Sequence, residues 1–233
     1  MIQDYAFPIE IIRTERTKSA SIQLVDEVVK VTVPKTLSDL RIQRLIAKKS
    51  AWIEQKIQFQ SQYPQLKQKE FVNGEAFTYL GRNYRLKTVS GPLGLVKMKS
   101  GYLEVGVPDN LSYSSNEALI RPSLEAWYIG HALSKLSKKT QRYADILGVD
   151  VGTVSVKNFK SRWGSCYISG DITYNWRIIM APQPIVDYVV VHELCHRLEH
   201  NHSPRYWRHV QNIIPDFKDR RSWLKTNGSA LII

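Results

Sequence analysis

The chain has 233 residues, of which 43% are hydrophobic, so one large domain or two small ones can bury an apolar core. Lys and Arg total 33 against 21 Asp and Glu, and the formal net charge is +12. This charge leaves nucleic acid, an anionic nucleotide or a membrane surface open as partners. The basic residues are dispersed along the chain, and the sequence contains no known nucleic-acid-binding motif. The ordinary interpretation is that these residues lie on solvent-exposed faces of the protein.

Several classes of protein are excluded by the composition. The chain contains no run of 18 apolar residues, and its first residues lack the basic start and apolar stretch of an export signal. The two cysteines, Cys166 and Cys195, are too few and too far apart for a disulfide framework. We therefore expect a soluble, cytoplasmic protein with no membrane partner, and the oligomeric state is left open.

The first half of the chain is expected to be a β-rich region with one long helix. β-Branched residues and alternating hydrophobicity predict strands over residues 9–14, 21–24, 28–33, 77–80, 83–89, 94–97 and 102–107. Apolar residues at helical spacing predict a helix over residues 39–60, with Ser38 as its cap. Turn-forming residues at 108–115 give the strongest boundary signal, so the expected domains are 1–110 and 111–233.

The second half is expected to combine helices with a small sheet. Periodicity predicts a helix from residue 116 to about residue 147, in which Pro122 lies near the start or marks a break. Strands are predicted over residues 153–156 and 172–180, and further helices over residues 203–213 and 216–225. The fold class predicted for the whole chain is therefore α+β.

The sequence V-H-E-L-C-H at residues 191–196 has the spacing of a metal-binding helix. On a helix, His192 and His196 lie one turn apart on one face, where two imidazole nitrogens can bind a single Zn²⁺. Glu193 between them is a candidate general base. Pro184 and the apolar residues after it are typical of a buried helix, whereas a strand would separate the histidines by roughly 13 Å.

A catalytic zinc usually has three protein ligands and a water, so a third ligand is needed. The candidates are Glu199, His200 and His202. On a straight helix Glu199 would lie roughly 10 Å from His192. His202 reaches the metal if the chain reverses after the helix, and Asn201 tolerates the left-handed conformation used at helix ends. We expect His202 to be the ligand, with Glu199 or a distant Glu as the fallback and His200 at the surface or behind the ligands.

Four sequence blocks in residues 160–207 follow one another as S-R-W-G-S-C, I-T-Y-N-W-R, D-Y-V-V-V-H-E-L-C-H and N-H-S-P-R-Y-W. Together they resemble the YgjP-like metallopeptidase family of zincins, which is related in active-site pattern to the SprT and WLM proteases. The N-terminal half, including L-G-R-N-Y-R at residues 80–85, also looks like the family. The resemblance implies a C-terminal zincin-like domain, in which the H-E-x-x-H helix packs on a small sheet whose edge strand can hold an extended substrate.

The resemblance also implies roles for particular residues. Zinc would be bound by His192, His196 and His202, and Glu193 would be the catalytic base. All four residues are present. Metzincins with the same histidine spacing carry glycine at the position of Glu199, so the metzincin turn is not implied.

Two further residues are candidates for substrate binding. Arg162 can hold a substrate carboxylate or phosphate bidentately, or it can form a structural ion pair that packs its loop. Trp163 and Gly164 are interpreted as a turn with an aromatic anchor, and the role of the whole R-W-G-S-C block stays open. Tyr206 is a candidate for oxyanion stabilisation, although we favour a packing role in the C-terminal helix.

The sequence therefore predicts a zinc-dependent hydrolase, most simply a metallopeptidase that cleaves amide bonds in a peptide or protein substrate. Two alternatives stay open. One is a metal-dependent hydrolase of nucleotide phosphoanhydrides, although phosphate chemistry more often uses oxygen-ligated Mg²⁺. The other is a non-catalytic zinc protein with a basic surface for nucleic acid, in which four protein ligands would close the metal site.

Overall fold

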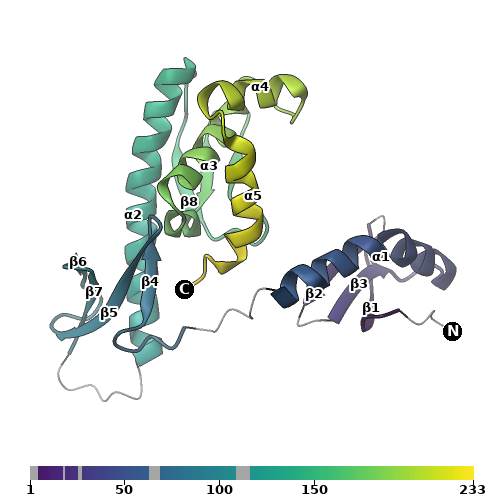
Figure 1. The fold of residues 1–233 in the computed structure, drawn as a ribbon, viewed down its shortest axis with the longest axis horizontal. Coiled ribbons are helices and arrows are strands. Elements are labelled where there is room, and N and C mark those ends of the chain that lie inside the picture. Colours follow the sequence, from purple (N-terminus) through teal and green to yellow (C-terminus); the bar gives the residue numbers. More distant parts are fainter. Residues whose placement is uncertain (1–4, 18, 26–27, 63–68, 109–115) are drawn as a thin grey trace. The chain divides into compact units, whose positions relative to one another are not determined.

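The structure is a computed structural model that describes residues 5–17, 19–25, 28–62, 69–108 and 116–233 (Figure 1). The chain forms two compact units, Met1–Lys67 and Gln68–Ile233. This division differs from the expected boundary at residue 110, because the strands over residues 76–107 share one hydrophobic core with the helices that follow them. Within the described ranges, none of the helices combines the length and apolar character needed to cross a bilayer.

The first unit is a three-stranded sheet packed against one helix. Its elements are β1 (Ile9–Thr14), β2 (Ser21–Val25), β3 (Val28–Pro34) and α1 (Asp39–Gln62). The strand order is β1-β3-β2, with β1 parallel and β2 antiparallel to β3. Alternate residues of β3, such as Val29 and Val31, are buried in one hydrophobic cluster with Ile42 and Ile46 of α1. The strands and the helix predicted for this region are confirmed.

The described residues of the second unit form two small sheets and four α-helices. Its first sheet consists of β4 (Ala76–Tyr79), β5 (Arg82–Ser90), β6 (Val96–Lys99) and β7 (Tyr102–Val107), in the order β4-β5-β7-β6. Its second sheet consists of β8 (Val154–Lys157), β9 (Gly164–Cys166) and β10 (Ile172–Asn175), in the order β8-β10-β9. The helices are α2 (Asn116–Leu147), α3 (Gln183–Cys195), α4 (Pro204–Ile213) and α5 (Phe217–Asn227), with 3-10 turns η2 (Trp176–Met180) and η3 (Gly228–Ala230). The predicted α+β class is confirmed.

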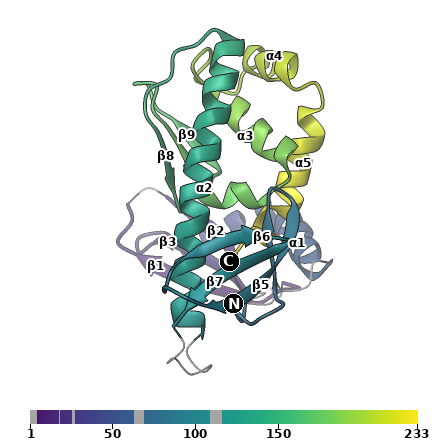
Figure 2. The same ribbon diagram turned by 90° about the vertical axis from the view of Figure 1, so that its left-hand side faces the viewer.

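The long helix α2 is the central element of the second unit. It runs alongside both α3 and the β8 edge of the second sheet (Figure 2). Its residues Leu124, Tyr128 and Leu136 are fully buried. The facing helix α3 is buried on nearly its whole circumference, with Val186 and Val190 fully inaccessible. This burial fits the prediction of an apolar core helix and holds the H-E-L-C-H sequence at a fixed place.

Three local features differ from their prediction or refine it. The strand predicted over residues 172–180 is β10 followed by η2, because the side chain of Asn175 accepts a hydrogen bond from Arg177 N at 3.2 Å and caps the turn. Gly164, interpreted from the sequence as part of a turn with Trp163, is the first residue of β9, which pairs antiparallel with β10. Pro122 lies inside α2, and the helix continues past it.

The turn between β4 and β5 docks on the segment that precedes α3. The Leu80 N–H donates to the Ile179 carbonyl at 2.8 Å. The Gly81 N–H donates to the Met180 carbonyl at 3.1 Å. Gly81 has a φ of +77°, and a Cβ at this position would lie 2.8 Å from the Cα of Pro182. The glycine therefore lets the first sheet approach the start of α3 backbone to backbone.

Replacing Gly81 by alanine is expected to lower the free energy of unfolding by about 2–4 kcal/mol, because the methyl group overlaps Pro182 and strains a left-handed residue. Gly101→Ala is the matched control, since Gly101 has a φ of +82° and no described atom within 4 Å of its Cβ position. That variant carries the backbone strain alone, about 1–2 kcal/mol. Urea unfolding measures both, and equal losses would show that the docking contact does not constrain the fold.

Candidate metal centre and active site

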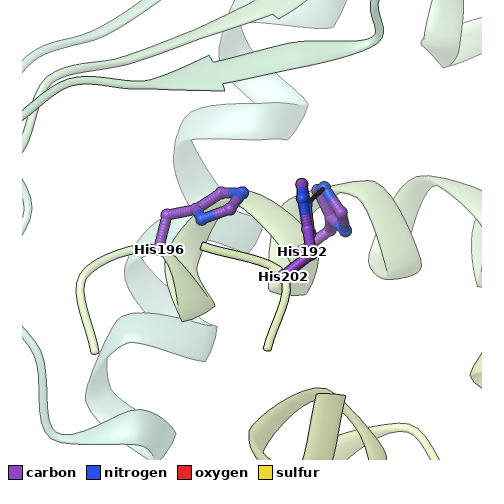
Figure 3. Close-up of side chains that lie close together, drawn as sticks. All are labelled: His192, His196 and His202. Carbon is purple, nitrogen blue, oxygen red and sulfur yellow. Dashed lines mark hydrogen bonds between the residues drawn. The ribbon is translucent and has the colours of Figure 1, made fainter. Parts of the chain in front are cut away.

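Three histidines of the second unit converge on one point (Figure 3). His192 lies in the last turn of α3, His196 caps the end of this helix, and His202 lies shortly before α4. One ligand nitrogen from each ring lies within 4.8 Å of the other two. The Nε2 atoms of His192 and His202 are 3.2 Å apart, which is close to the edge of a tetrahedral zinc site, roughly 3.3 Å. The fold therefore brings the three predicted ligands together.

The chain reverses direction between His196 and His202 without the expected left-handed residue. Asn201 is not among the described residues with positive φ. Its side-chain oxygen instead accepts a hydrogen bond from Ser203 N at 3.2 Å. The hydroxyl of Ser203 in turn accepts one from Tyr206 N at 3.2 Å and caps the start of α4. The left-handed expectation for Asn201 was wrong because side-chain hydrogen bonds form this turn.

Glu199 supports the site through its backbone and not through its carboxylate. Nδ1 of His196 lies 3.2 Å from the Glu199 carbonyl oxygen. Because a carbonyl only accepts hydrogen bonds, Nδ1 carries the proton and Nε2 keeps its lone pair for a metal. The Glu199 carboxylate pairs with Arg205 at 2.8 Å and is not part of the histidine cluster. The observed arrangement thus favours His202 over Glu199 as the third ligand.

The donor set suits a transition metal. Burial, together with the neighbouring imidazoles, lowers the pKa of His192 to about 3. Burial also lowers the pKa of His196. Neutral rings are the form in which imidazole binds a metal, and three nitrogens in reach of one point match the ligands preferred by zinc and related ions. The residues present therefore fit a bound metal.

Tyr206 packs behind the histidines. Its side chain is fully buried, and its hydroxyl donates to the backbone oxygen of His192 at 2.7 Å. Its ring stacks on His196 at a centroid distance of 4.7 Å and an interplanar angle of 30°. Burial raises the pKa of this phenol. These contacts favour the packing role over oxyanion stabilisation, because the hydroxyl is already committed to the backbone of α3.

Trp207 holds the ring of His202. The two rings stack at 5.5 Å with an interplanar angle of 23°. On α5, Phe217 stacks with Trp207 at 5.3 Å and 15°, and the guanidinium of Arg221 lies 4.9 Å from the Trp207 ring centroid. His202 lies outside any helix, so no helix backbone fixes its orientation. The aromatic stack restrains its ring instead.

Glu193 points from α3 to β9. Its side chain is buried, with 5% exposed, and a Cβ on Gly164 would lie only 2.5 Å from its Oε1 atom. The backbone N–H of Cys166 is close enough to this carboxylate to favour its charged form. Burial raises the pKa of Glu193 to about 7, although the charge of Arg162 and the Cys166 N–H lower it. This role of Gly164 was not predicted from the sequence, where the available signal was that glycine in a strand often marks a close approach of another segment.

The R-W-G-S-C block is anchored to β10. Asn175 Nδ2 donates to the backbone oxygens of Phe159 at 3.0 Å and Arg162 at 3.4 Å. The backbone N–H of Asn175 donates to the Trp163 carbonyl at 2.8 Å. The indole of Trp163 packs on Gly228, where a Cβ would lie 2.9 Å from the ring. These contacts give the block a structural role that the sequence left open. They hold β9 in the position where Gly164 packs against Glu193 of α3.

A cavity of about 430 Å³ opens beside the histidines. Its lining consists of Arg162, Trp163, Gly164, Ser165, Cys166, Tyr188, Val189, His192, Glu193, His196, His200, His202 and Leu224. Arg162 is exposed at this cavity, as expected of a substrate-binding residue, whereas Tyr206 does not line it. His200, expected at the surface or behind the ligands, is exposed and also borders the cavity.

The family model described as YgjP-like, metallopeptidase domain, matches residues 18–227. The chain belongs to this family. Its class is therefore that of a metal-dependent protease. The crystal structure of the metallopeptidase zymogen of Pyrococcus abyssi abylysin is similar over 39% of this chain and 93% of that chain, with 23% identity and a TM-score of 0.36. A search of curated proteins finds no match.

Trp207→Leu is expected to weaken Zn²⁺ binding about 10-fold, because the ring of His202 loses the stack that orients it. Trp223→Leu on α5 is the matched control, since no ring contact joins Trp223 to a site histidine among the described residues. Competition with a chromophoric chelator measures the affinity of both variants. Equal weakening in the two variants would show that general loss of packing, and not orientation of His202, is responsible.

Proposed function

We propose that the protein is a zinc metallopeptidase that hydrolyses amide bonds in a peptide or protein substrate. The convergence of His192, His196 and His202 beside Glu193 in one cavity carries this proposal. Three imidazole ligands suit zinc and leave a position for water, as in catalytic zinc sites. In the part of the chain that the structure describes, the histidine cluster has three members, whereas structural zinc sites generally have four ligands.

Zinc held by the three histidines would supply Lewis-acid polarisation of the scissile carbonyl and a lowered pKa for water. Glu193 is the proposed general base, whose carboxylate takes the proton of the attacking water and later donates a proton to the leaving nitrogen. The buried carboxylate packs closely against Gly164 beside the cavity, so its position is set before substrate binds. Tyr206 and the Glu199 carbonyl keep α3 and the ring of His196 in place.

The free edge of β9 is proposed to bind the backbone of the substrate. In an antiparallel pair, alternate residues direct their N–H and C=O groups to the partner strand. Trp163 faces β10, since its carbonyl accepts from Asn175 N at 2.8 Å. Gly164 and Cys166 have the opposite parity, so their backbone groups point to the outer edge that borders the cavity. An extended peptide can pair with the Gly164 groups there and pass Glu193.

Arg162 is proposed to bind a carboxylate of the substrate. Its guanidinium lies over the ring of Phe159 at 5.4 Å, and the residue is exposed at the cavity. The positive charge of Arg162 also lowers the pKa of Glu193. A substrate carboxylate bound to Arg162 would partly neutralise this positive charge beside the catalytic base. The planar guanidinium supports bidentate recognition of such a group.

The chemistry of the site weighs against both alternative functions. A nucleotide phosphoanhydride hydrolase would more often use Mg²⁺ with oxygen ligands, whereas this cluster offers nitrogen. A non-catalytic zinc protein would not need a buried carboxylate held at a cavity beside the metal ligands.

The free thiols of Cys166 and Cys195 support the proposed cytoplasmic location, where cysteines stay reduced.

Glu193→Gln is expected to lower cleavage of an unstructured protein by about 10²–10⁴-fold while zinc stays bound, because the amide cannot accept the water proton. His202→Ala is expected to lose zinc. His200→Ala is the matched histidine control and is expected to retain zinc, since His200 lies outside the cluster. Elemental analysis and gel-based cleavage assays measure these outcomes.

Three results would contradict the proposal. Zinc absent from metal-replete wild-type protein would remove the metal site. Zinc present without cleavage of any polypeptide, together with release of phosphate from nucleotides that Glu193→Gln abolishes, would establish the phosphoanhydride alternative. Zinc loss in His200→Ala equal to that in His202→Ala would reassign the third ligand.

Gly164→Ala is expected to reduce cleavage about 100-fold with zinc retained, because a methyl group 2.5 Å from Oε1 displaces the general base. Gly130→Ala on α2 is the control for an added methyl group, since no described atom other than its chain neighbours and the nearby backbone of its own helix lies within 4 Å of its Cβ position. Cleavage rates at saturating substrate compare the two variants. Full activity in Gly164→Ala would show that the contact with β9 does not position Glu193.

A further inference from the structure

The solvent-facing side of α1 in the first unit carries a concentrated positive charge. Four residues of this helix, Arg44, Lys48, Trp52 and Lys56, are spaced four apart, so they form one continuous ridge about 18 Å long. Two further exposed cations flank it, and we call the set the α1 ridge: Arg41, Arg44, Lys48, Lys49, Trp52 and Lys56. A different side of the helix, with Ile42, Ile46 and Ile53, packs into the hydrophobic cluster with the sheet.

The cations of the α1 ridge differ from the cations of the sheet in the same unit. Three sheet-side cations each pair with an acid: Arg13 with Asp39, Lys30 with Glu10, and Lys35 with Glu15. The five cations of the ridge form no ion pair with any residue that the structure describes. The two acids of α1 do not neutralise these cations. Asp39 forms an ion pair with Arg13, and Glu54 projects about 200° around the helix from Trp52. Among the described residues, these three sheet-side cations are thus paired with acids, whereas the cations of the ridge are not.

Trp52 lies within this charged surface. It is 44% exposed, although tryptophan usually gains from burial, and its neighbours at four residues on either side are Lys48 and Lys56. A single exposed aromatic residue is common on protein surfaces. An exposed indole between cations on one ridge is less ordinary, because it offers a flat apolar face together with positive charge on both sides. Unpaired bases joined by phosphates present the complementary chemistry.

We propose that the α1 ridge binds single-stranded nucleic acid, with Trp52 stacking on an unpaired base and Arg44, Lys48 and Lys56 contacting the phosphates. Arg44 and Lys48 add the sequence-independent electrostatic attraction that dominates such binding. Trp52 makes the ridge selective for strands whose bases are unpaired, because a duplex offers no free base face at this position. DNA and RNA share this chemistry.

This inference goes beyond the proposed peptidase activity and does not depend on it. The ridge belongs to the first unit, whereas the histidines and Glu193 belong to the second. The full-length Glu193→Gln protein is therefore expected to bind oligonucleotide as the wild type does. A failure of the peptidase proposal would leave this expectation in place, and a failure of the ridge would leave the metal site in place.

The test uses full-length protein and fluorescent oligo(dT) and oligo(U) of about 20 nucleotides, with binding followed by anisotropy at several salt concentrations. Arg44→Gln/Lys48→Gln is expected to weaken binding about 10-fold and to lower the slope of log K against log salt by about 1.4, or 0.7 per lost phosphate contact. Lys135→Gln/Lys138→Gln on the exposed side of α2 removes the same charge and is expected to change binding less than about twofold.

Tryptophan fluorescence supplies a second readout. Trp52 is the tryptophan of the first unit, and the other five lie in the second, so subtracting the signal of Trp52→Phe isolates it. Oligonucleotide is expected to quench this signal, and Trp52→Ala is expected to weaken binding about 10-fold. Thermal unfolding and zinc content of each variant verify that it is folded.

Four outcomes would overturn the proposal. Equal weakening by the α1 and α2 double variants would show that only the net charge matters. Binding of a duplex as tightly as the single strand, without quenching of Trp52, would remove the stacking contact. Binding to vesicles that contain phosphatidylserine, with no binding to either oligonucleotide, would identify a membrane surface as the partner. No binding to any of these probes at low salt would leave the ridge without an anionic partner.

Discussion

The candidate active site depends on one geometric constraint, the convergence of three imidazoles from a helix and the segment that follows it. His192 and His196 are placed by the helical repeat of α3, but His202 meets them only because the chain turns back before α4. Hydrogen bonds of Asn201 and Ser203 form this turn, and Trp207 restrains the ring that it presents. The aromatic residues of α4 are thus part of the metal centre without being ligands.

The same helix also sets the position of the carboxylate. Glu193 follows His192 in sequence and therefore projects from a different side of α3, where it meets β9. Glycine at position 164 permits this contact, and Asn175 holds the loop that leads into the strand. His192, the proposed base and the proposed substrate edge are consequently linked through one buried helix, so close packing constrains their relative geometry.

The two compact units divide the chemistry of the chain. The second unit contains the histidines, the buried carboxylate and the cavity, and its core extends from the β4–β7 sheet to the C-terminus. The first unit has its own small core, and its helix presents the α1 ridge to solvent. A dispersed excess of basic residues in the sequence thus becomes, on α1, a continuous charged surface, because helical spacing places residues four apart side by side.

The sequence by itself determined the features that depend on local spacing. Periodicity located α1 and α2, and the interval between His192 and His196, together with the apolar residues after Pro184, located α3 and specified a shared helix face. The tertiary structure decided what depends on residues distant in sequence. β9 exists because residues 164–166 pair with β10, the unit boundary follows from the packing of β4 and β5 on later elements, and His202 rather than Glu199 meets the other histidines because of the turn between helices. Local patterns contain no information on such contacts, because packing between distant segments and not the repeat of one element determines them.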